Sequence, residues 1–482
     1  MLNNINYYNK LGLSPNASQA EIRSAYRKIM LKVHPDVNSK EGATELFLDI
    51  QKAYTILSDP TAKTAYDAKK HTENKPSLVN IQPLYSCDAL RRIEEPQLIY
   101  ILIDTKTIKT HSQKTRLPLN LVLLLDLSNS MKGKRLNTLK EATIDIIKEL
   151  DPEDFLTIIT FNDRAQVILS PQDQEGKKHI ESKIKRLIAS GGTEIYRGLE
   201  AGFKQINQDY DTGWTNHIIL ITDGHTYGDE EVCIELAQKA ARRDVGISCF
   251  GIGSEWNDNF LDEIAFLTGG SSLYIQKPKQ IKQFLGKKIY QLSKVFAKNI
   301  LLDIQTAPKV TLNSAFRLLP EVCSFPNTPP FSLGTLRYNT TQRILLEFLV
   351  EPVPSVINEA ILANVEFTFK LLMGEHQTSI TLQRSVVSQD ICIEPPPSEI
   401  LQAMSQLTLY RMQEKAQLKL AQGNHQGASQ ILNNLSSHLL AKEEDSLGKI
   451  ALKESSNIEA HHEISPNGQK MLKYGTRKLL SH

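Results

Sequence analysis

Residues 121–130 read LVLLLDLSNS, and this stretch decides the fold of the middle of the chain. Its first half, Leu121 to Leu125, is an unbroken apolar run, which predicts a strand buried on both faces in a parallel sheet. Further apolar runs lie at 155–161, 217–222 and 245–251, and amphipathic stretches lie at 136–150, 178–188, 195–206, 230–243 and 279–295. This alternation predicts a doubly wound, Rossmann-like α/β domain with its binding site at the carboxyl ends of the strands.

Polar side chains stand where the predicted strands end. They are Asp126, Ser128 and Ser130 after the first run, Thr193 after two glycines, and Asp223 after the run at 217–222. Two carboxylates and three hydroxyls are hard oxygen ligands, which favour Mg²⁺, Mn²⁺ or Ca²⁺ over zinc or copper. Because three of these donors are neutral, a bound metal would remain a good Lewis acid toward an incoming carboxylate. The pattern therefore predicts a divalent-metal site with an open coordination position.

This ordered set resembles the metal-ion-dependent adhesion site of von Willebrand factor A (VWA) domains, and the resemblance covers roughly residues 118–290. It implies that the five residues hold a divalent ion, Mg²⁺ first, with Mn²⁺ and Ca²⁺ as alternatives. It also implies that an exposed Asp or Glu of a protein ligand fills the open position, and that the site contains no catalytic residue.

Other interpretations of the same residues stay open. Ser128 and Ser130 could cap the next helix, and Asp223 with Gly224 could form an ordinary strand-to-loop turn. In an enzymatic interpretation Ser128 is a nucleophile and His225 its base, although no nucleophile elbow surrounds the serine. These alternatives differ in what the serine hydroxyls contact.

The first seventy residues predict a pair of helices. Ser18 and Glu21 form a capping box, and apolar residues then recur at helical spacing as far as Val33. A second apolar stripe runs over 43–57 and ends before Pro60. Two stripes of matching length predict antiparallel packing. The opposite face of the first helix carries a basic row, Arg23, Arg27, Lys28 and Lys32.

The segment between these helices contains His34-Pro35-Asp36, which we expect at an exposed tip beside the basic row. Together with YYNKLGL at 7–13 and AYTILSDP at 53–60, it resembles a J domain spanning residues 5–68. The resemblance implies that His34, Pro35 and Asp36 contact a DnaK-type chaperone and trigger its ATP hydrolysis. The basic row would steer an acidic surface toward them, or would be only a solvated helix face.

Alternating, β-branched stretches flank the central domain, one at 98–107 before it and others between 301 and 386 after it. They predict a small β-sandwich into which the VWA-like domain is inserted. Three prolines at 395–397 precede helices expected over 400–421, 425–441 and 442–461. The expected organisation is a J domain at 1–70, a linker at 71–93, a β-sandwich at 94–117 and 297–392, a VWA domain at 118–296, and a helical C-terminal region at 396–482.

Composition narrows the classes of partner and compartment. The 482 residues contain 56 Lys plus Arg and 54 Asp plus Glu, so the net charge of +2 excludes an overall cationic nucleic-acid binder. The five cysteines are scattered and form no C-x-x-C pair, which favours a reducing compartment. The N-terminus lacks a signal-peptide core and apolar runs are too short for a membrane span, so we expect a cytoplasmic protein.

The function expected from these features is that of a co-chaperone or adaptor without enzymatic activity of its own. The J domain would stimulate a DnaK-type ATPase while the VWA domain binds a protein partner through metal. One alternative is a VWA scaffold that organises a multi-protein or membrane-associated assembly. A metal-dependent enzyme acting on a small substrate is the third hypothesis.

Overall fold

The computed structural model describes residues 7–11, 13, 17–33, 43–59, 63, 79–108, 117–172, 177–226, 228–325, 328–354, 356–371, 374–388 and 395–480. The chain separates into two compact units, Met1–Leu78 and Val79–His482, each of which is described by itself. The predicted chaperone-contacting residues His34, Pro35 and Asp36 lie outside the described residues.

The first unit contains the predicted helix pair. Its helices are α1 (Tyr7–Lys10), α2 (Gln19–Val33) and α3 (Ala43–Ser58). The capping box is confirmed: the Ser18 amide donates to Glu21 Oε2 at 2.7 Å, and the Glu21 amide donates to Ser18 Oγ at 3.3 Å. Tyr26 of α2 stacks on Tyr54 of α3 with ring centroids 3.9 Å apart. The two helices therefore pack through the stripes that the sequence predicts, around a core of Tyr8, Leu11, Ala17, Ile22, Ile50, Ala53 and Leu57.

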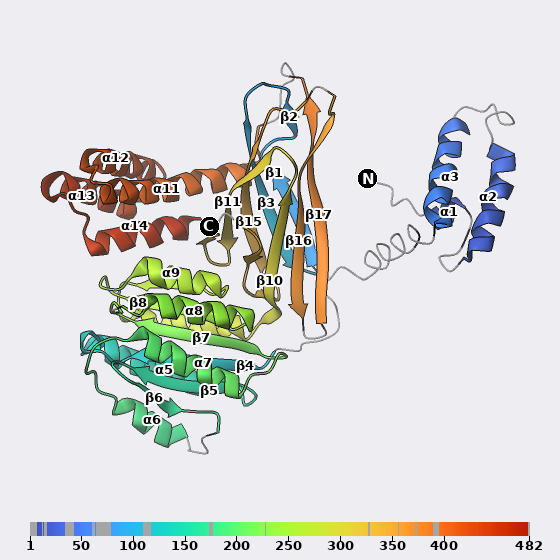
Figure 1. Cartoon of the computed structure of the whole chain (residues 1–482). Helices are drawn as coiled ribbons and strands as arrows, with labels where there is room; N and C mark the ends of the chain where they lie inside the picture. The colour runs from blue at the N-terminus through green and yellow to red at the C-terminus, as the bar shows by residue number, and fades with distance from the viewer. Residues whose placement is uncertain are drawn as a thin grey trace. The chain divides into compact units, whose positions relative to one another are not determined.

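The central domain of the second unit is the predicted doubly wound α/β domain (Figure 1). Its sheet has the order β6-β5-β4-β7-β8-β9, in which β6 is antiparallel to β5 and the other pairs are parallel. The strands are β4 (Leu119–Asp126), β5 (Phe155–Phe161), β6 (Ala165–Leu169), β7 (Thr215–Thr222), β8 (Gly246–Ile252) and β9 (Ser272–Ile275). The helices are η1 (Asn129–Met131), α5 (Lys134–Glu149), α6 (Lys177–Lys185), α7 (Ile195–Gln208), α8 (Glu230–Arg242), α9 (Asp258–Leu267) and α10 (Gln280–Leu292).

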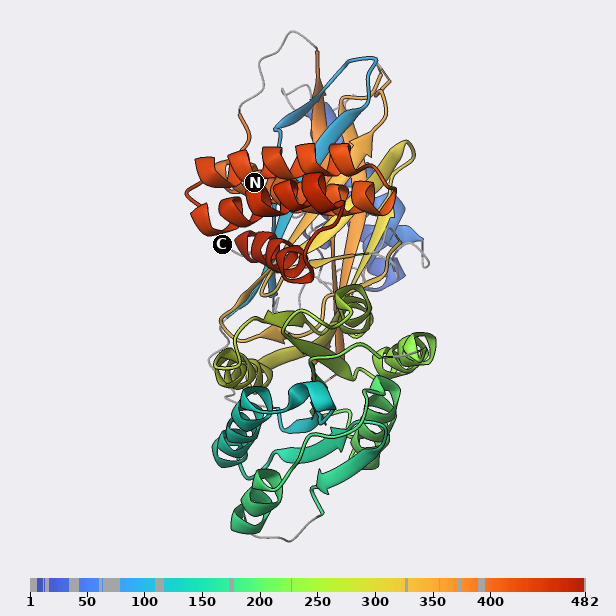
Figure 2. The same cartoon turned by 90° about the vertical axis from the view of Figure 1, so that its left-hand side faces the viewer.

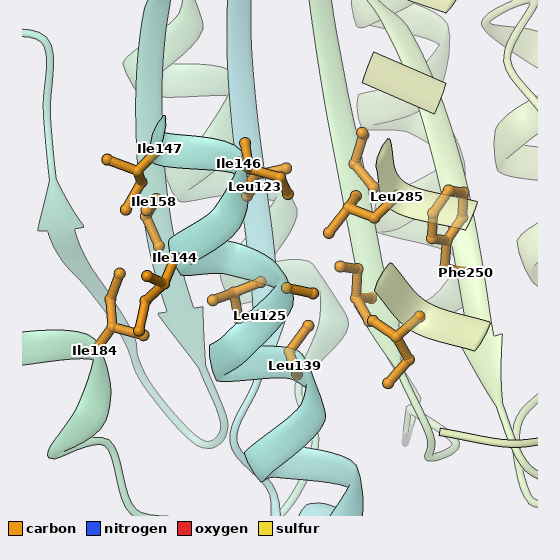
Figure 3. Close-up of a cluster of buried hydrophobic side chains, with 14 of the residues drawn as sticks. Leu123, Leu125, Leu139, Ile144, Ile146, Ile147, Ile158, Ile184, Phe250 and Leu285 are labelled. Carbon is orange, nitrogen blue, oxygen red and sulfur yellow. The ribbon is translucent and has the colours of Figure 1, made fainter. Parts of the chain in front are cut away.

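Helices cover both faces of this sheet (Figure 2). Every residue of β4 is buried, as the apolar run predicts. Leu123 and Leu125 pack with Leu139 and Ile146 of α5 and Leu285 of α10 (Figure 3). On the other face, Val122 and Leu124 pack against α7, α8 and α9. Because both faces are covered by packed helices, the strand ends are where polar side chains of the sheet can reach solvent.

The flanking strands form the predicted sandwich of two sheets. One sheet has the order β1-β3-β15-β11-β12 and the other β13-β10-β16-β17-β2, with β14 paired to β10. The strands are β1 (Val79–Tyr85), β2 (Ala89–Arg91), β3 (Gln97–Thr107), β10 (Val295–Thr306), β11 (Val310–Leu319), β12 (Cys323–Ser324), β13 (Phe331–Ser332), β14 (Leu336–Arg337), β15 (Thr341–Val350), β16 (Glu359–Leu371) and β17 (Gly374–Val387).

The insertion of the α/β domain into this sandwich is confirmed. Strand β3 precedes the α/β domain, and it pairs along its length with β15, from Gln97 opposite Val350 to Lys106 opposite Thr341. The expectation of a linker over 71–93 is wrong from Val79 onward, because β1 and β2 extend the two sheets there. Pro83 lies in β1, whose single partner in its sheet is β3, and an edge strand tolerates proline.

The C-terminal region is helical and packs on the rest of the second unit (Figure 1). Its helices are α11 (Ser398–Ala421), α12 (His425–Ala441), α13 (Asp445–His461) and α14 (Pro466–Leu479), the last of which the sequence pattern did not predict. Ile400, Leu407 and Tyr410 of α11 pack on Leu102 and Phe316 of the sandwich. Within the described ranges, no helix is both long and apolar enough to cross a membrane.

Helix α14 docks on α9 of the α/β domain through buried charges. Asp262 accepts hydrogen bonds from Arg477 Nη1 at 2.9 Å and Tyr474 Oη at 3.0 Å, and pairs with Lys473 Nζ at 2.9 Å. Burial alone would raise the pKa of Asp262, but Arg477 and Lys473 outweigh burial and hold that pKa well below its usual range. This carboxylate therefore joins the helical region to the α/β domain.

Replacing Asp262 with alanine should lower the free energy of unfolding by about 3–5 kcal/mol, because Arg477 would lose its carboxylate partner, whereas Lys473 would keep Asp258. The matched control is Glu194→Ala, which removes an exposed ion pair with Arg197. The control should cost about 0–1 kcal/mol. Urea unfolding followed by circular dichroism measures both losses, and equal losses would contradict this account of the junction.

Candidate metal site

The candidate site lies at the topological switch point of the central sheet. The chain runs from β4 to β5 and β6 on one side, and returns at β7 on the other side of β4. Strands β4 and β7 are parallel, with Leu125 opposite Ile221, so Asp126 and Asp223 emerge at the same edge. In open α/β sheets this crevice is where ligands bind.

Asp126 is fully buried and is held by neutral donors. Its Oδ1 accepts the Ser128 amide at 2.7 Å, and its Oδ2 accepts the Thr222 hydroxyl at 2.6 Å. Burial raises the pKa of Asp126 to about 6, although the hydrogen bonds from Thr222 and Ser128 act in the opposite direction. The ionised carboxylate is thus costly in this environment, and a nearby cation would stabilise it.

Asp223 is also fully buried, but one of its partners is charged. Its Oδ1 accepts the Ser130 hydroxyl at 2.6 Å, and its Oδ2 pairs with the guanidinium of Arg135 at the start of α5. The hydroxyls of Ser128 and Ser130 lie 3.0 Å apart. Ser128 is buried and Ser130 is exposed, so the pair of hydroxyls links the surface to both carboxylates.

Thr193 lies near Asp223 on a loop that hydrogen bonds hold in position. The Ser190 amide donates to Leu127 O at 2.7 Å, and the Gly192 amide donates to Asp163 Oδ1 at 2.8 Å. A Cβ added at Gly224 would lie 2.9 Å from Thr193 Oγ1, so glycine leaves room for this hydroxyl beside the strand end. The structure therefore brings all five sequence-predicted residues together at the ends of β4 and β7.

These residues fit a hard divalent cation. The donors are carboxylate and hydroxyl oxygens, which Mg²⁺, Mn²⁺ and Ca²⁺ prefer. A protein cation, the Arg135 guanidinium, already pairs with Asp223, which shows that positive charge is favoured there. Only two of the five ligands are carboxylates, and within the described residues no three His, Cys, Asp or Glu side chains gather as a metal site.

The alternative interpretations of the serines agree less well with the structure. Ser128 precedes η1, but its side chain makes no capping hydrogen bond, and the residue that caps α5 is Gly133. The Ser128 hydroxyl lies against Ser130 instead. His225 is exposed, and within the described residues no hydrogen bond joins it to Ser128. The pairing of a nucleophile with a base is therefore not present.

Sequence reasoning missed residues that position the set. Thr222 holds Asp126, Arg135 pairs with Asp223, and Asp163 anchors the loop of Thr193. Thr222 could have been found, because it is the last residue of an apolar run and directly follows Ile221, the register partner of Leu125. Arg135 and Asp163 act across loops, and their spacing from the motif carries no such signal.

In the first unit, the basic row is present on α2 as far as the structure describes it. Arg23, Arg27 and Lys28 are exposed. Lys32 lies in α2, but its side chain is outside the described residues, as is the whole of His34-Pro35-Asp36.

Family models match separate parts of the chain. The DnaJ domain model matches residues 6–67, and the von Willebrand factor type A domain model matches residues 120–287. A third model, described as the Sll0103-like C-terminal alpha-helical domain, matches residues 398–482. The chain thus carries an N-terminal J domain, a VWA domain in the middle and a helical C-terminal domain.

Similar proteins cover different shares of the chain. The uncharacterized protein sll0103 of Synechocystis sp. is 27% identical over 336 residues, which are 67% of this chain and 79% of that protein. The chaperone protein DnaJ of Lactococcus lactis is 52% identical over 66 residues, which are 14% of this chain. The match spans 17% of that chaperone, so the likeness covers only a small part of either chain.

Solved structures resemble the second unit in fold. A von Willebrand factor type A protein from Catenulispora acidiphila aligns with a TM-score of 0.65 and 16% identity, over 84% of this chain and 97% of that chain. The ArnB paralog VWA2 from Sulfolobus acidocaldarius aligns with a TM-score of 0.54 and 13% identity, over 84% and 100%. At these identities the likeness shows the fold alone.

Replacing Thr222 with valine should lower the free energy of unfolding by about 1–3 kcal/mol in EDTA near pH 8, because the ionised Asp126 loses a buried donor. Thr143→Val is the matched control, since the buried Thr143 hydroxyl donates only to the carbonyl of Leu139. That change should cost about 1 kcal/mol or less. Urea unfolding compares the two variants, and a larger loss in the control would contradict the role assigned to Thr222.

Proposed function

We propose that this chain is a co-chaperone or adaptor without enzymatic activity of its own. Its J domain recruits a DnaK-type chaperone and stimulates the ATPase of that chaperone. Its VWA domain binds a protein partner by a metal-bridged contact with an exposed Asp or Glu of that partner. The proposal rests on one observation: the same chain carries a J domain and a VWA sheet with carboxylate and hydroxyl oxygens gathered at its switch point.

The chaperone side of the proposal rests on the first unit. The DnaJ domain model matches residues 6–67, and this range includes the segment His34-Pro35-Asp36. Arg23, Arg27 and Lys28 are exposed on one helix, and Lys32 continues the row in sequence. A row of cations of this kind steers an acidic surface and raises the rate of encounter. The J domain would thus present the tripeptide to the chaperone while the basic row orients it.

The partner side rests on the candidate metal site. Asp126, Ser128, Ser130, Thr193 and Asp223 would hold the ion, Mg²⁺ first, with Mn²⁺ or Ca²⁺ as alternatives. When bound, the ion supplies a Lewis acid for an incoming carboxylate. The protein's own contribution is to keep both aspartates buried and oriented by Thr222, Ser128 and Ser130. The exposed Ser130 leaves that crevice accessible from solvent.

The proposal includes the cytoplasm as the location. The described cysteines, Cys87, Cys233, Cys249 and Cys323, are free thiols, which supports a reducing compartment. Burial raises the pKa of the Cys233 and Cys249 thiols far above the usual range, so these two favour the unreactive protonated form.

His34→Gln should abolish stimulation of the ATPase of a DnaK-type chaperone, because the J-domain resemblance assigns the contact to this tripeptide. The matched control is His438→Gln on α12, an exposed histidine in another domain. A single-turnover ATPase assay measures both variants against the wild-type chain. Unchanged stimulation by His34→Gln would refute the co-chaperone proposal and favour a scaffold.

Asp126→Ala should abolish binding of Mg²⁺, which isothermal titration calorimetry measures on the full chain. Asp145→Ala is the control, because it removes a carboxylate of α5 that pairs with Lys282 outside the crevice. Asp126→Asn keeps the side-chain volume but removes the charge and one of the two acceptor oxygens. A pull-down from the native cell in Mg²⁺ or EDTA extends the test to the partner. Partner capture unaffected by EDTA would refute metal-bridged binding.

A further inference from the structure

The two carboxylates of the candidate metal site differ in the charge of the groups that donate to them. Both donors to Asp126 are uncharged, namely the Ser128 amide and the Thr222 hydroxyl. Asp223 Oδ1 accepts a hydrogen bond from the Ser130 hydroxyl, and Asp223 Oδ2 pairs with the Arg135 guanidinium. Both oxygens of each carboxylate are thus occupied by donors of the protein itself, and one of these donors is a cation.

The guanidinium of Arg135 has a second contact and enough room to reach Asp223. It is the second residue of α5, and its Nη1 also donates to the carbonyl of Ser130 at 3.3 Å. A Cβ added at Gly253, which follows β8, would lie 2.9 Å from Arg135 Nη2. The absence of a side chain at Gly253 thus leaves room for the guanidinium to approach Asp223.

The exposure of the two partners differs, and this difference indicates which one can move. The Asp223 side chain is 0% exposed, whereas the Arg135 side chain is 33% exposed. Asp223 directly follows the buried strand β7, while Arg135 is a long and partly exposed side chain. The guanidinium can therefore leave toward solvent without any change in the sheet.

A divalent ion and this guanidinium cannot both neutralise Asp223 without mutual repulsion. Two like charges within a few ångströms in a partly buried crevice repel strongly. Lone pairs of Asp223 Oδ2 that face the guanidinium are also unavailable to a metal. The contacts that stabilise the chain without metal therefore oppose metal binding.

We propose that Arg135 is a built-in counter-ion that competes with the divalent metal for Asp223. In the metal-free chain it neutralises the buried carboxylate and keeps the crevice stable. Metal binding requires its displacement, so Arg135 sets the metal concentration at which the site is filled. This inference rests on the metal-dependent function proposed above and assigns the regulation of that same site.

The test measures Mg²⁺ affinity of the full chain by isothermal titration calorimetry. Arg135→Ala and Arg135→Gln should each bind Mg²⁺ at least about tenfold more tightly than the wild type, because the competing charge is gone. Lys134→Ala is the matched control, since it removes one positive charge from the neighbouring exposed residue. The control should change the affinity by less than about threefold.

Thermal unfolding gives a second readout that is independent of affinity. In EDTA both Arg135 variants should melt at a lower temperature than the wild type, because Asp223 is buried without a cation. Saturating Mg²⁺ should raise their melting temperature more than it raises that of the wild type. A variant stabilised in EDTA would overturn the proposed counter-ion role.

The outcomes separate this inference from the function on which it depends. If the wild type binds Mg²⁺ and both Arg135 variants bind it equally or more weakly, the proposed competition is overturned. The metal site itself would stand. If the Arg135 variants bind Mg²⁺ and the wild type does not bind it, the competition is supported. If neither the wild type nor any Arg135 variant binds Mg²⁺, both the inference and the metal-dependent function are refuted.

Discussion

The burial of two carboxylates at the ends of neighbouring parallel strands is the constraint on which the second unit depends. Asp126 and Asp223 are both fully buried at one edge of the sheet. An isolated buried charge is too costly to persist without hydrogen bonds or a counter-ion. The sheet meets this need with Thr222 beside Asp126 and Arg135 beside Asp223. The crevice is consequently a place where positive charge is stabilised.

Packing in the rest of the VWA domain fixes the position of this edge. Its two apolar cores lie on opposite faces of the sheet, so strand positions are determined by packing rather than by the polar residues. The domain also joins the sandwich through strands on both sides of the insertion, because β3 and β10 belong to different sheets. Asp262 and Arg477 add a third connection through α14. The crevice is thus carried by a scaffold fixed at several points.

Much of the fold could be predicted because local patterns and packing agree. The run Leu121 to Leu125 predicts a doubly buried strand, and the polar residues after it predict the edge where a site forms. Ser18 and Glu21 likewise mark the start of α2 from sequence alone. In these cases the apolar period, the cap and the tertiary contacts all favour the same structure.

The parts that escaped prediction depend on contacts distant in sequence. The buried face of α14 includes Lys470 and Lys473, which pair with Asp258 of α9, so hydrophobic periodicity could not reveal it. Its start was nevertheless marked by the Ser465 cap and a proline in the first turn. Strand β1 could not be predicted from the sequence, because its residues are mixed in polarity. Its partner β3 also lies beyond a turn. No sequence pattern marks Arg135, because its role depends on where the fold places Asp223.

The central claim is that the crevice between β4 and β7 holds a divalent metal ion. Crystals of the full chain grown with Mn²⁺ test it most directly, because anomalous scattering locates manganese without reference to the protein. The account predicts one strong anomalous peak within coordination distance of the Ser128 and Ser130 hydroxyls, with Asp126 and Asp223 around it. Crystals saturated with Mn²⁺ that show no peak at this crevice would contradict it.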